Sequence, residues 1–198
     1  MKNGGIVAVA ILLGVAACQK EEQVADLTAQ EQTDLVYLIQ EEKLAHDVYV
    51  FAYEKYGEMI FNNITSSEQS HMDQVEVVLV KYGITNPIDG LDVGVFQNAA
   101  LQTLYGNLIA IADSSLVHAL KVGATIEDLD IHDIETLYAN SVNPDLIGVY
   151  DVLTCGSRNH LRSFISKLDG LGETYVPQYL STAEFDAIVN SAKGNCGN

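Results

Sequence analysis

Glu68 and His71 are the residues whose types and spacing point most directly to chemistry. Three positions apart in an expected helix, they share one helical face, and that face continues through apolar residues such as Met72 and Val75. A carboxylate and an imidazole that point into an apolar interior need partners, because an unpaired buried charge is costly. A Glu-x-x-His step that faces the inside of a helical bundle is one way in which proteins hold a pair of metal ions.

Other stretches also place a metal-binding side chain in the middle of an apolar helical face. At 100° per residue, the chain offers one more acid before this stretch, and two acids and a histidine after it. We therefore expect one buried group of metal ligands, which consists of Glu42, Glu68, His71, Glu127, Asp130 and His160. Within this group Glu68 is the first candidate for a bridging ligand and Glu127 the second, with Asp130 at the edge.

Carboxylates together with imidazoles suit iron, manganese or zinc, and two bridging acids favour a pair of iron or manganese ions over zinc. We expect two such ions, with a single ion as the alternative. The competing interpretation is that the inner polar groups only pair with one another, as Glu42 with His46, Glu68 with His160 and Glu127 with His71. Buried ion networks of that kind often add little stability. The recurrence of metal-binding side chains on four helices favours the metal interpretation.

The same periodicity predicts the helices that must position these side chains. Pairs of Ser or Thr with a Glu three residues later mark helix starts at Thr28, Thr65 and Ser181, and Pro144 suits a first helical turn. With their caps, the expected helices cover about 28–56, 65–82, 98–112, 113–139, 143–169 and 181–190, with a joint over 57–64. They predict an all-α four-helix bundle, with an extra helix in the long connection between the second and third main helices and a short C-terminal helix.

Three segments resemble the signatures of an uncharacterised bacterial and archaeal family in the ferritin-like superfamily. They are Glu41-Glu42-Lys43-Leu44-Ala45-His46-Asp47-Val48-Tyr49, Ser67-Glu68-Gln69-Ser70-His71-Met72 and Gly156-Ser157-Arg158-Asn159-His160-Leu161. Glu in the first helix, Glu-x-x-His in the second and Glu in the third follow the di-iron carboxylate pattern of that superfamily. The resemblance covers roughly Leu35 to Leu168 and implies a ferritin-like bundle, without a known substrate.

One position departs from that pattern. A second Glu-x-x-His would need Glu at position 157, where this chain has Ser157. Asp130 from the adjacent helix can replace the missing carboxylate, a water held by Ser157 can replace it, or only one metal binds. His46, one turn from Glu42, is either an additional ligand or a histidine that is hydrogen-bonded inside the core.

Residues 1–17 have the pattern of an export signal, with a basic start at Lys2 and an apolar run from Ile6 to Ala17. The end of the run, Leu13-Gly14-Val15-Ala16-Ala17-Cys18, resembles the lipobox of bacterial lipoproteins. This resemblance implies cleavage before Cys18 and a lipid on Cys18 that anchors the protein to a membrane. The polar, charged composition that follows predicts a tether over 18–27, and the chain length suits a single domain over 28–198. An ordinary secretory signal with an incidental cysteine is the alternative.

The residues after Cys18 bear on location. By resemblance to known sorting rules, Gln19 favours the outer membrane over the inner membrane. Lys20-Glu21-Glu22 resembles a short tag for export to the cell surface. We therefore expect a lipid-anchored protein of the cell envelope, at the outer membrane or the cell surface.

Charge and cysteine content narrow the partners further. A formal net charge of −17 argues against nucleic acid and anionic lipid surfaces as partners, whereas an acidic shell attracts cations. After cleavage, Cys155 and Cys196 are the remaining internal cysteines. In an oxidising compartment such a pair is more often bridged than catalytic, so we expect a disulfide between them.

The sequence leaves two function classes open. The first is a redox protein with two metal ions, such as an oxidase, a peroxidase or a ferroxidase. The second is a non-catalytic bundle that binds a partner at the envelope and has a degenerate metal site. The convergence of metal-binding side chains favours the first class.

Overall fold

The structure of the protein, a computed structural model, describes Met1 and residues 26–196. Most of the predicted signal peptide and tether therefore lie outside the described residues, and so does Cys18. Within the part of the chain that is described, all the regular elements are helices. None of these helices is long and apolar enough to cross a membrane.

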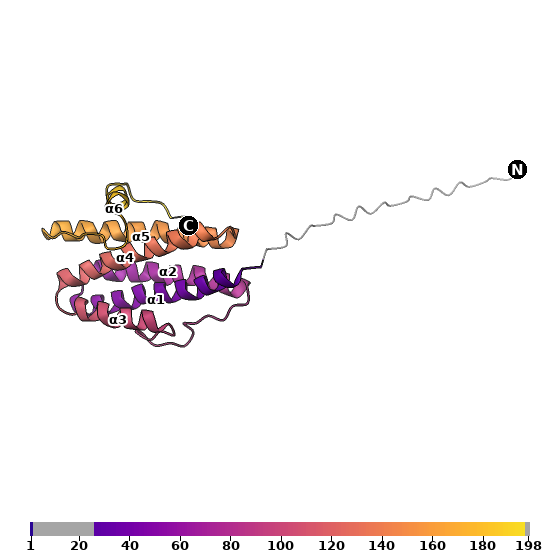
Figure 1. The fold of residues 1–198 in the computed structure, drawn as a ribbon, viewed down its shortest axis with the longest axis horizontal. Coiled ribbons are helices and arrows are strands. Elements are labelled where there is room, and N and C mark those ends of the chain that lie inside the picture. Colours follow the sequence, from indigo (N-terminus) through magenta and orange to yellow (C-terminus); the bar gives the residue numbers. More distant parts are fainter. Residues whose placement is uncertain (2–25, 197–198) are drawn as a thin grey trace.

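Four long helices form the bundle and two shorter ones flank it (Figure 1). The elements in chain order are α1 (Ala29–Tyr56), α2 (Met59–Lys81), α3 (Ala99–Ala112), α4 (Leu116–Asn140), α5 (Pro144–Gly170) and α6 (Thr182–Val189). α1 packs mainly on α2, and α4 packs mainly on α5. The predicted all-α bundle is confirmed, with α3 as the extra helix between the second and third main helices and α6 near the C-terminus.

Most helix ends follow the predicted signals. Thr28 and Ser181 each form the reciprocal capping box, with Glu31 and Glu184 respectively. α1 ends at Gly57, whose φ of 67° is a left-handed conformation that glycine adopts without strain. Pro144 occupies the first turn of α5, as predicted.

The predicted start of α2 is wrong. The helix begins at Met59, and Thr65 lies inside it, where its hydroxyl donates to the carbonyl of Phe61 at 2.8 Å. Ser and Thr can bond to the carbonyl four residues earlier, so a capping pattern can also occur within a helix. Phe61 and Ile64 are buried in phase with Glu68, and this packing extends the helix through the predicted joint.

The apolar core has two parts with buried polar side chains between them. One part holds the contacting rings of Tyr49, Phe61 and Phe164, with ring centroids 5.4 to 6.3 Å apart. The other part includes Leu38, at the N-terminal half of α1, and Leu153 of α5. Each long helix therefore carries polar residues to the same level of the bundle, where the two apolar parts separate.

Candidate metal centre

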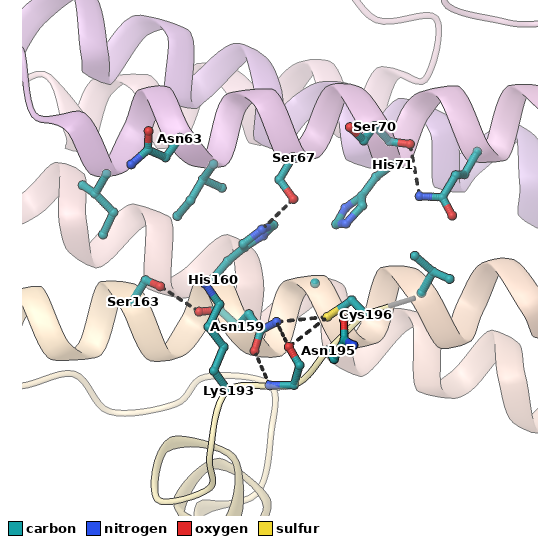
Figure 2. Close-up of a pocket in the computed structure, with 16 residues that line it drawn as sticks. Asn63, Ser67, Ser70, His71, Asn159, His160, Ser163, Lys193, Asn195 and Cys196 are labelled. Atoms are coloured by element: carbon teal, nitrogen blue, oxygen red, sulfur yellow. Dashed lines mark hydrogen bonds between the residues drawn. The ribbon is translucent and has the colours of Figure 1, made fainter. Parts of the chain in front are cut away.

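The predicted ligands all lie at this polar level. Each is at least nine-tenths buried: Glu42 on α1, Glu68 and His71 on α2, Glu127 and Asp130 on α4, and His160 on α5. Figure 2 shows the rings of His71 and His160 in the space between α2 and α5. Helical periodicity explains the convergence, because each residue occupies the inward face of its own helix.

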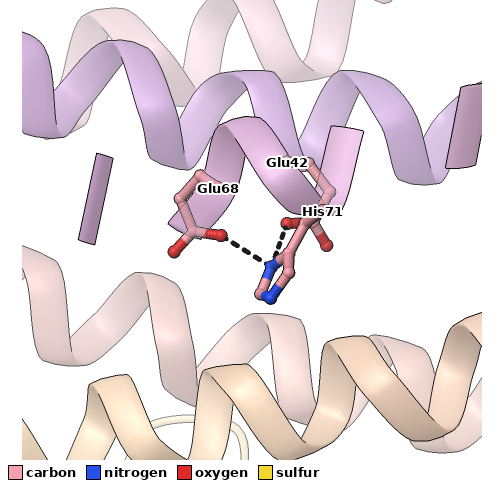
Figure 3. Close-up of side chains that lie close together, drawn as sticks. All are labelled: Glu42, Glu68 and His71. Carbon is pink, nitrogen blue, oxygen red and sulfur yellow. Dashed lines mark hydrogen bonds and ion pairs between the residues drawn. The ribbon is translucent and has the colours of Figure 1, made fainter. Parts of the chain in front are cut away.

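The first group of side chains is formed by Glu42, Glu68 and His71 (Figure 3). One candidate ligand atom from each lies within 4.8 Å of the others. The Nδ1 atom of His71 is 3.0 Å from Glu42 Oε2 and 2.8 Å from Glu68 Oε2. This imidazole therefore lies between carboxylates of two different helices.

The second group is formed by Glu68, Glu127 and His160, with candidate ligand atoms again within 4.8 Å. His160 Nδ1 is 2.9 Å from Glu68 Oε1 and 3.3 Å from Glu127 Oε2. Glu68 therefore belongs to both groups and offers one oxygen to each histidine. The two imidazole rings stack, with centroids 5.6 Å apart and an interplanar angle of 29°.

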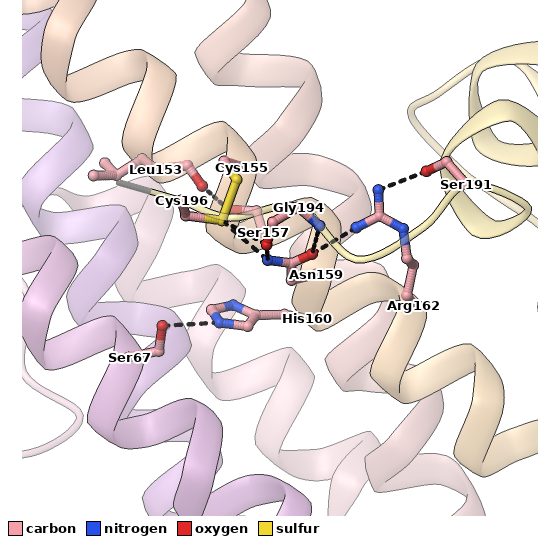
Figure 4. The surroundings of a disulfide bond; sticks show 10 residues. All are labelled: Ser67, Leu153, Cys155, Ser157, Asn159, His160, Arg162, Ser191, Gly194 and Cys196. Atoms are coloured by element: carbon pink, nitrogen blue, oxygen red, sulfur yellow. Dashed lines mark hydrogen bonds between the residues drawn. A yellow bond between two sulfur atoms is a disulfide. The ribbon is translucent and has the colours of Figure 1, made fainter. Parts of the chain in front are cut away.

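The outer edges of the two rings have different surroundings. His160 Nε2 is 2.9 Å from the hydroxyl of Ser67 (Figure 4). His71 Nε2 lies against Gly156, where a Cβ atom would come within 2.4 Å of it. Glycine at position 156 is therefore required for the observed position of the His71 ring, since real Cβ atoms do not approach so closely.

Asp130 belongs to neither group and contacts the position that departs from the family pattern. Ser157 Oγ donates a short hydrogen bond to Asp130 Oδ2 and also contacts the carbonyl of Leu153 at 2.9 Å. Burial raises the pKa of Asp130 well above its usual value, and the nearby carboxylates of Glu42 and Glu41 raise it further. Asp130 therefore lies where a carboxylate is absent from α5, in a setting that favours its protonated form.

Tyr49 contacts Glu127, a member of the second group. Its hydroxyl donates to Glu127 Oε1 and also lies 3.3 Å from the carbonyl of Gly123. The ring of Tyr49 packs against Phe164, with centroids 5.4 Å apart. The sequence indicates that Tyr49 faces inward, and the structure adds that it orients one candidate ligand.

The histidines and carboxylates of this cluster shift one another's pKa values. Burial raises the pKa of Glu42 to about 7, although His71 opposes that rise. Burial lowers the pKa of His160, but the carboxylates of Glu68 and Glu127 outweigh this effect and raise it to about 10. The pKa of Glu68 is also raised by burial, yet both histidines bring it below its usual value. These shifts favour protonated histidines beside the inner carboxylates when no metal is bound.

Several buried atoms nevertheless lack a hydrogen bond. Among the described residues these are Glu42 Oε1, Glu68 Oε1, Asp130 Oδ1 and His160 Nδ1 within the cluster. The contact of 2.9 Å between His160 and Glu68 is an ion pair whose angles do not meet hydrogen-bond geometry. Because unpaired buried polar atoms are rare, this donor set fits a bound cation, which would satisfy oxygen and nitrogen atoms together.

The structure corrects two of the pairings in the competing interpretation. His46 Nδ1 is 2.9 Å from Asp47, so His46 pairs with its sequence neighbour and lies outside both groups. Glu127 pairs with His160, and His71 pairs with Glu42 and Glu68. The expected pair of Glu68 with His160 is present. Helical phase alone does not decide which inward residues of neighbouring helices meet, so the partners of Glu42 and Glu127 were not predicted.

Glu41 is a buried acid beside the cluster that sequence reasoning did not count among the candidate ligands. It is 3% exposed, and neither of its carboxylate oxygens has a hydrogen-bond partner. Burial raises its pKa well above the usual value, and Asp133 and Glu42 raise it further. Asp133 presents another carboxyl group, so the two can share a hydrogen bond only when one carries a proton. The sequence signal for a second buried acid was the adjacent pair Glu41-Glu42. Two successive residues of a helix face different neighbours, so both can be buried when the helix is covered on more than one side.

A disulfide joins Cys155 of α5 to Cys196 of the C-terminal tail, with Cα atoms 5.4 Å apart (Figure 4). The Asn159 side chain supports this connection, because it accepts from the Gly194 N–H at 2.9 Å and donates to the Gly194 carbonyl at 3.0 Å. The tail is thereby fixed beside His160, which lies five residues after Cys155 on α5.

Comparison with known proteins gives one consistent result. The family described as "Uncharacterized protein domain (DUF2202)" matches residues 31–192. "Uncharacterized protein MJ0754" of Methanocaldococcus jannaschii is 45% identical over 166 residues, which are 84% of this chain and 90% of that protein. The crystal structure of hypothetical protein MJ0754 superposes with a TM-score of 0.84 at 44% identity, covering 86% of this chain and 97% of that chain. The family match includes every candidate ligand.

Proposed function

The chain belongs to the DUF2202 family, and we propose that its buried cluster is a two-metal carboxylate centre for iron or manganese. The observation that carries the proposal is the position of Glu68, whose two oxygens face two separate histidines. A carboxylate placed in this way can bridge two cations, as in helical bundles that hold metal pairs. Zinc is less favoured, because structural zinc sites are usually closed by four tetrahedral ligands rather than bridged by carboxylates.

The ligands divide between two positions. Glu42 and His71 would hold one ion, Glu127 and His160 would hold the other, and Glu68 would lie between them. Each histidine turns Nδ1 toward the carboxylates, which leaves Nε2 for an outer partner such as the Ser67 hydroxyl beside His160. Bound iron or manganese would supply one-electron redox chemistry toward dioxygen or peroxide.

The protein's own residues determine which position stays more open. Three residues before the histidine of the second position, α5 has Ser157, whereas α2 has Glu68 three residues before the histidine of the first position. Ser157 donates a hydrogen bond to Asp130. A metal at the second position would share Glu68 without gaining a carboxylate from α5, and it would keep room for water or a small reactant. We assign the protein on this basis to the oxidases, peroxidases or ferroxidases of the ferritin-like superfamily.

A non-catalytic bundle is the second candidate function, and one observation favours it. The histidines and carboxylates neutralise one another in this structure by ion pairs of 2.8 to 3.3 Å. A cluster paired in this way can persist as an internal ion network without a metal. The protein would then act by binding a partner.

Elemental analysis of the purified protein distinguishes the two functions. We expect iron or manganese at up to two ions per chain, and loss of both ions in Glu68→Ala with the helical circular dichroism retained. Glu76→Ala is the matched control, because Glu76 is an exposed acid on the same helix. Metal-free wild-type protein, or a Glu68→Ala variant with unchanged metal content, would favour the internal ion network.

We also propose that the protein is anchored in the cell envelope through a lipid on Cys18. The support is the sequence Val15-Ala16-Ala17-Cys18 after an apolar run, which precedes the described domain. Cys18→Ala should remove the protein from the membrane fraction and lower its mass by that of the lipid. A wild-type protein with an unmodified N-terminus would contradict this proposal.

A further inference from the structure

A polar cavity of about 630 Å³ lies between α2 and α5, on the outer side of the two histidine rings (Figure 2). Its walls come from α2 between Ile60 and Gln74, from α5 between Val152 and Ser163, and from the C-terminal tail at Lys193 to Cys196. His71 and His160 both line it, so the cavity adjoins the candidate metal centre. Its volume suits a small molecule.

The described lining of the cavity lacks the acidic side chains that are abundant in the rest of this chain. The chain has 27 acidic and 10 basic residues, yet none of the described side chains that line the cavity is a carboxylate. The lining instead supplies neutral polar groups, such as those of Ser67, Ser70 and Asn63, together with Lys193. A cation would find no counter-charge here, whereas an anion would meet hydrogen-bonding groups and a positive charge.

Lys193 differs from the other lysines in the described part of the chain. Each of these others pairs with an acid: Lys43 with Asp47, Lys55 with Asp113, Lys81 with Asp145, Lys121 with Glu173 and Lys167 with Glu58. Within the described residues, Lys193 has neither an ion pair nor a hydrogen bond to its ammonium group. A lysine that has no acidic partner in the described part of so acidic a chain is available to a ligand.

His71 supplies a second group that lacks a partner. The residue is 4% exposed, and its Nε2 atom, beside Gly156, has no hydrogen-bond partner among the described residues. Nδ1 is engaged by the carboxylates of Glu42 and Glu68. A metal-bound histidine as a rule donates its other ring N–H to an acceptor, as His160 can to Ser67. An acceptor for His71 has to come from the cavity, a step that rests on the proposed function.

We propose that this cavity binds a small anion with several oxygen acceptors. Lys193 meets its charge, the His71 Nε2–H donates to one of its oxygens, and the serine and asparagine side chains of the lining supply further hydrogen bonds. The tail forms one wall, held by the Cys155–Cys196 disulfide and by Asn159. The anion would occupy a separate site at the back of the metal ligands.

Calorimetric titration of the purified protein with inorganic phosphate and with succinate tests the proposal, with chloride at equal ionic strength as the reference. Saturable binding of phosphate alone would identify an inorganic oxyanion, and binding of succinate would identify an organic carboxylate. Lys193→Gln should weaken binding by about three- to tenfold, as expected for one lost charge-assisted contact. The matched control Lys121→Gln makes the same charge change outside the cavity and should have little effect.

A second variant tests the contribution of the C-terminal tail to the cavity and leaves the positive charge of Lys193 unchanged. Cys155→Ser together with Cys196→Ser releases the tail and should abolish saturable anion binding, with helix content retained. No saturable binding of either anion, equal weakening by Lys193→Gln and Lys121→Gln, or intact binding in the double serine variant would each overturn the inference. Metal analysis of the same samples separates the two proposals. Bound metal without anion binding contradicts only the anion site, whereas anion binding without metal contradicts only the metal centre.

Discussion

The two helix pairs of the bundle supply two halves of the central cluster that follow one plan. In each half a Glu from the first helix meets a His from the second, as Glu42 meets His71 at 3.0 Å and Glu127 meets His160 at 3.3 Å. Three residues before the histidine, however, α2 has Glu68 and α5 has Ser157. The backbone arrangement is thus repeated while the ligand set is not.

This difference explains why Glu68 contacts both histidines. With no carboxylate on α5 at that level, His160 takes its partners from α2 and α4. Asp130, which is the remaining acid on this side, is held by Ser157 and has a raised pKa. One shared carboxylate can therefore serve two imidazoles, and we expect two metal positions of unequal affinity.

Removal of each histidine should give the largest difference between the halves. His160→Ala removes a ligand of the weaker position, so we expect one tightly bound ion per chain to remain. His71→Ala removes a ligand of the stronger position, and we expect less than one ion to remain. Metal content after dialysis measures both. Equal losses in the two variants would show that the halves do not differ.

Restoring the missing carboxylate should reduce the difference in metal affinity between the two halves. Ser157→Glu would add an acid beside His160 and Asp130, which destabilises the metal-free protein and tightens the second ion by about tenfold. Titration of the second ion under chelator competition measures the change. Ser166→Glu, an exposed position on the same helix, is the control. Unchanged affinity in a folded Ser157→Glu variant would contradict the assigned role of position 157.

The stability of the metal-free protein should fall as the pH rises. Burial lowers the pKa of His160, but the carboxylates of Glu68 and Glu127 outweigh burial and raise the pKa to about 10. A raised pKa means that the folded protein binds the His160 proton more tightly than the unfolded protein does. The resulting stabilisation is complete below the unfolded pKa of 6.5, and it is lost as the pH rises from 6.5 to about 10. The loss from His160 should reach about 1 kcal/mol per pH unit in that window.

Glu42, whose pKa is raised by burial from 4.5 to about 7, also lowers stability as the pH rises between these two values. Bound metal should reverse the trend, because metal ligands must be deprotonated. Thermal unfolding at pH 6.5, 7.5 and 8.5, with and without metal, measures both effects. A metal-free protein that gains stability over this range would contradict the assigned charges.

Loss of the Tyr49 hydroxyl should have the smallest effect and should act on the second half alone. Tyr49→Phe removes the hydrogen bond to Glu127 and keeps the ring packed on Phe164. We expect a loss of about 1–2 kcal/mol in unfolding free energy and weaker binding of the second ion only. Denaturant unfolding and metal titration measure the two effects. Weaker binding of the first ion would show that the halves are coupled through Glu127.

Helical periodicity accounts for what could be predicted from the sequence. The inward position of Glu68 or Glu127 depends only on its phase within an apolar helical face, which can be read from the sequence. The partners of these side chains depend on how the helices pack, so the expected Glu127–His71 pair was replaced by Glu127–His160. The start of α2 was missed for a similar reason, because packing of Phe61 and Ile64 outweighs a local capping signal.

Three consecutive residues of α5 face three different neighbours. Cys155 is bonded to the tail, Gly156 lies against His71 of α2, and Ser157 donates to Asp130 of α4. An insertion or deletion of one residue before this turn would rotate it by about 100°. The disulfide, the close approach and the hydrogen bond would then be lost together. This part of α5 should therefore accept changes of side chain far more readily than changes of length.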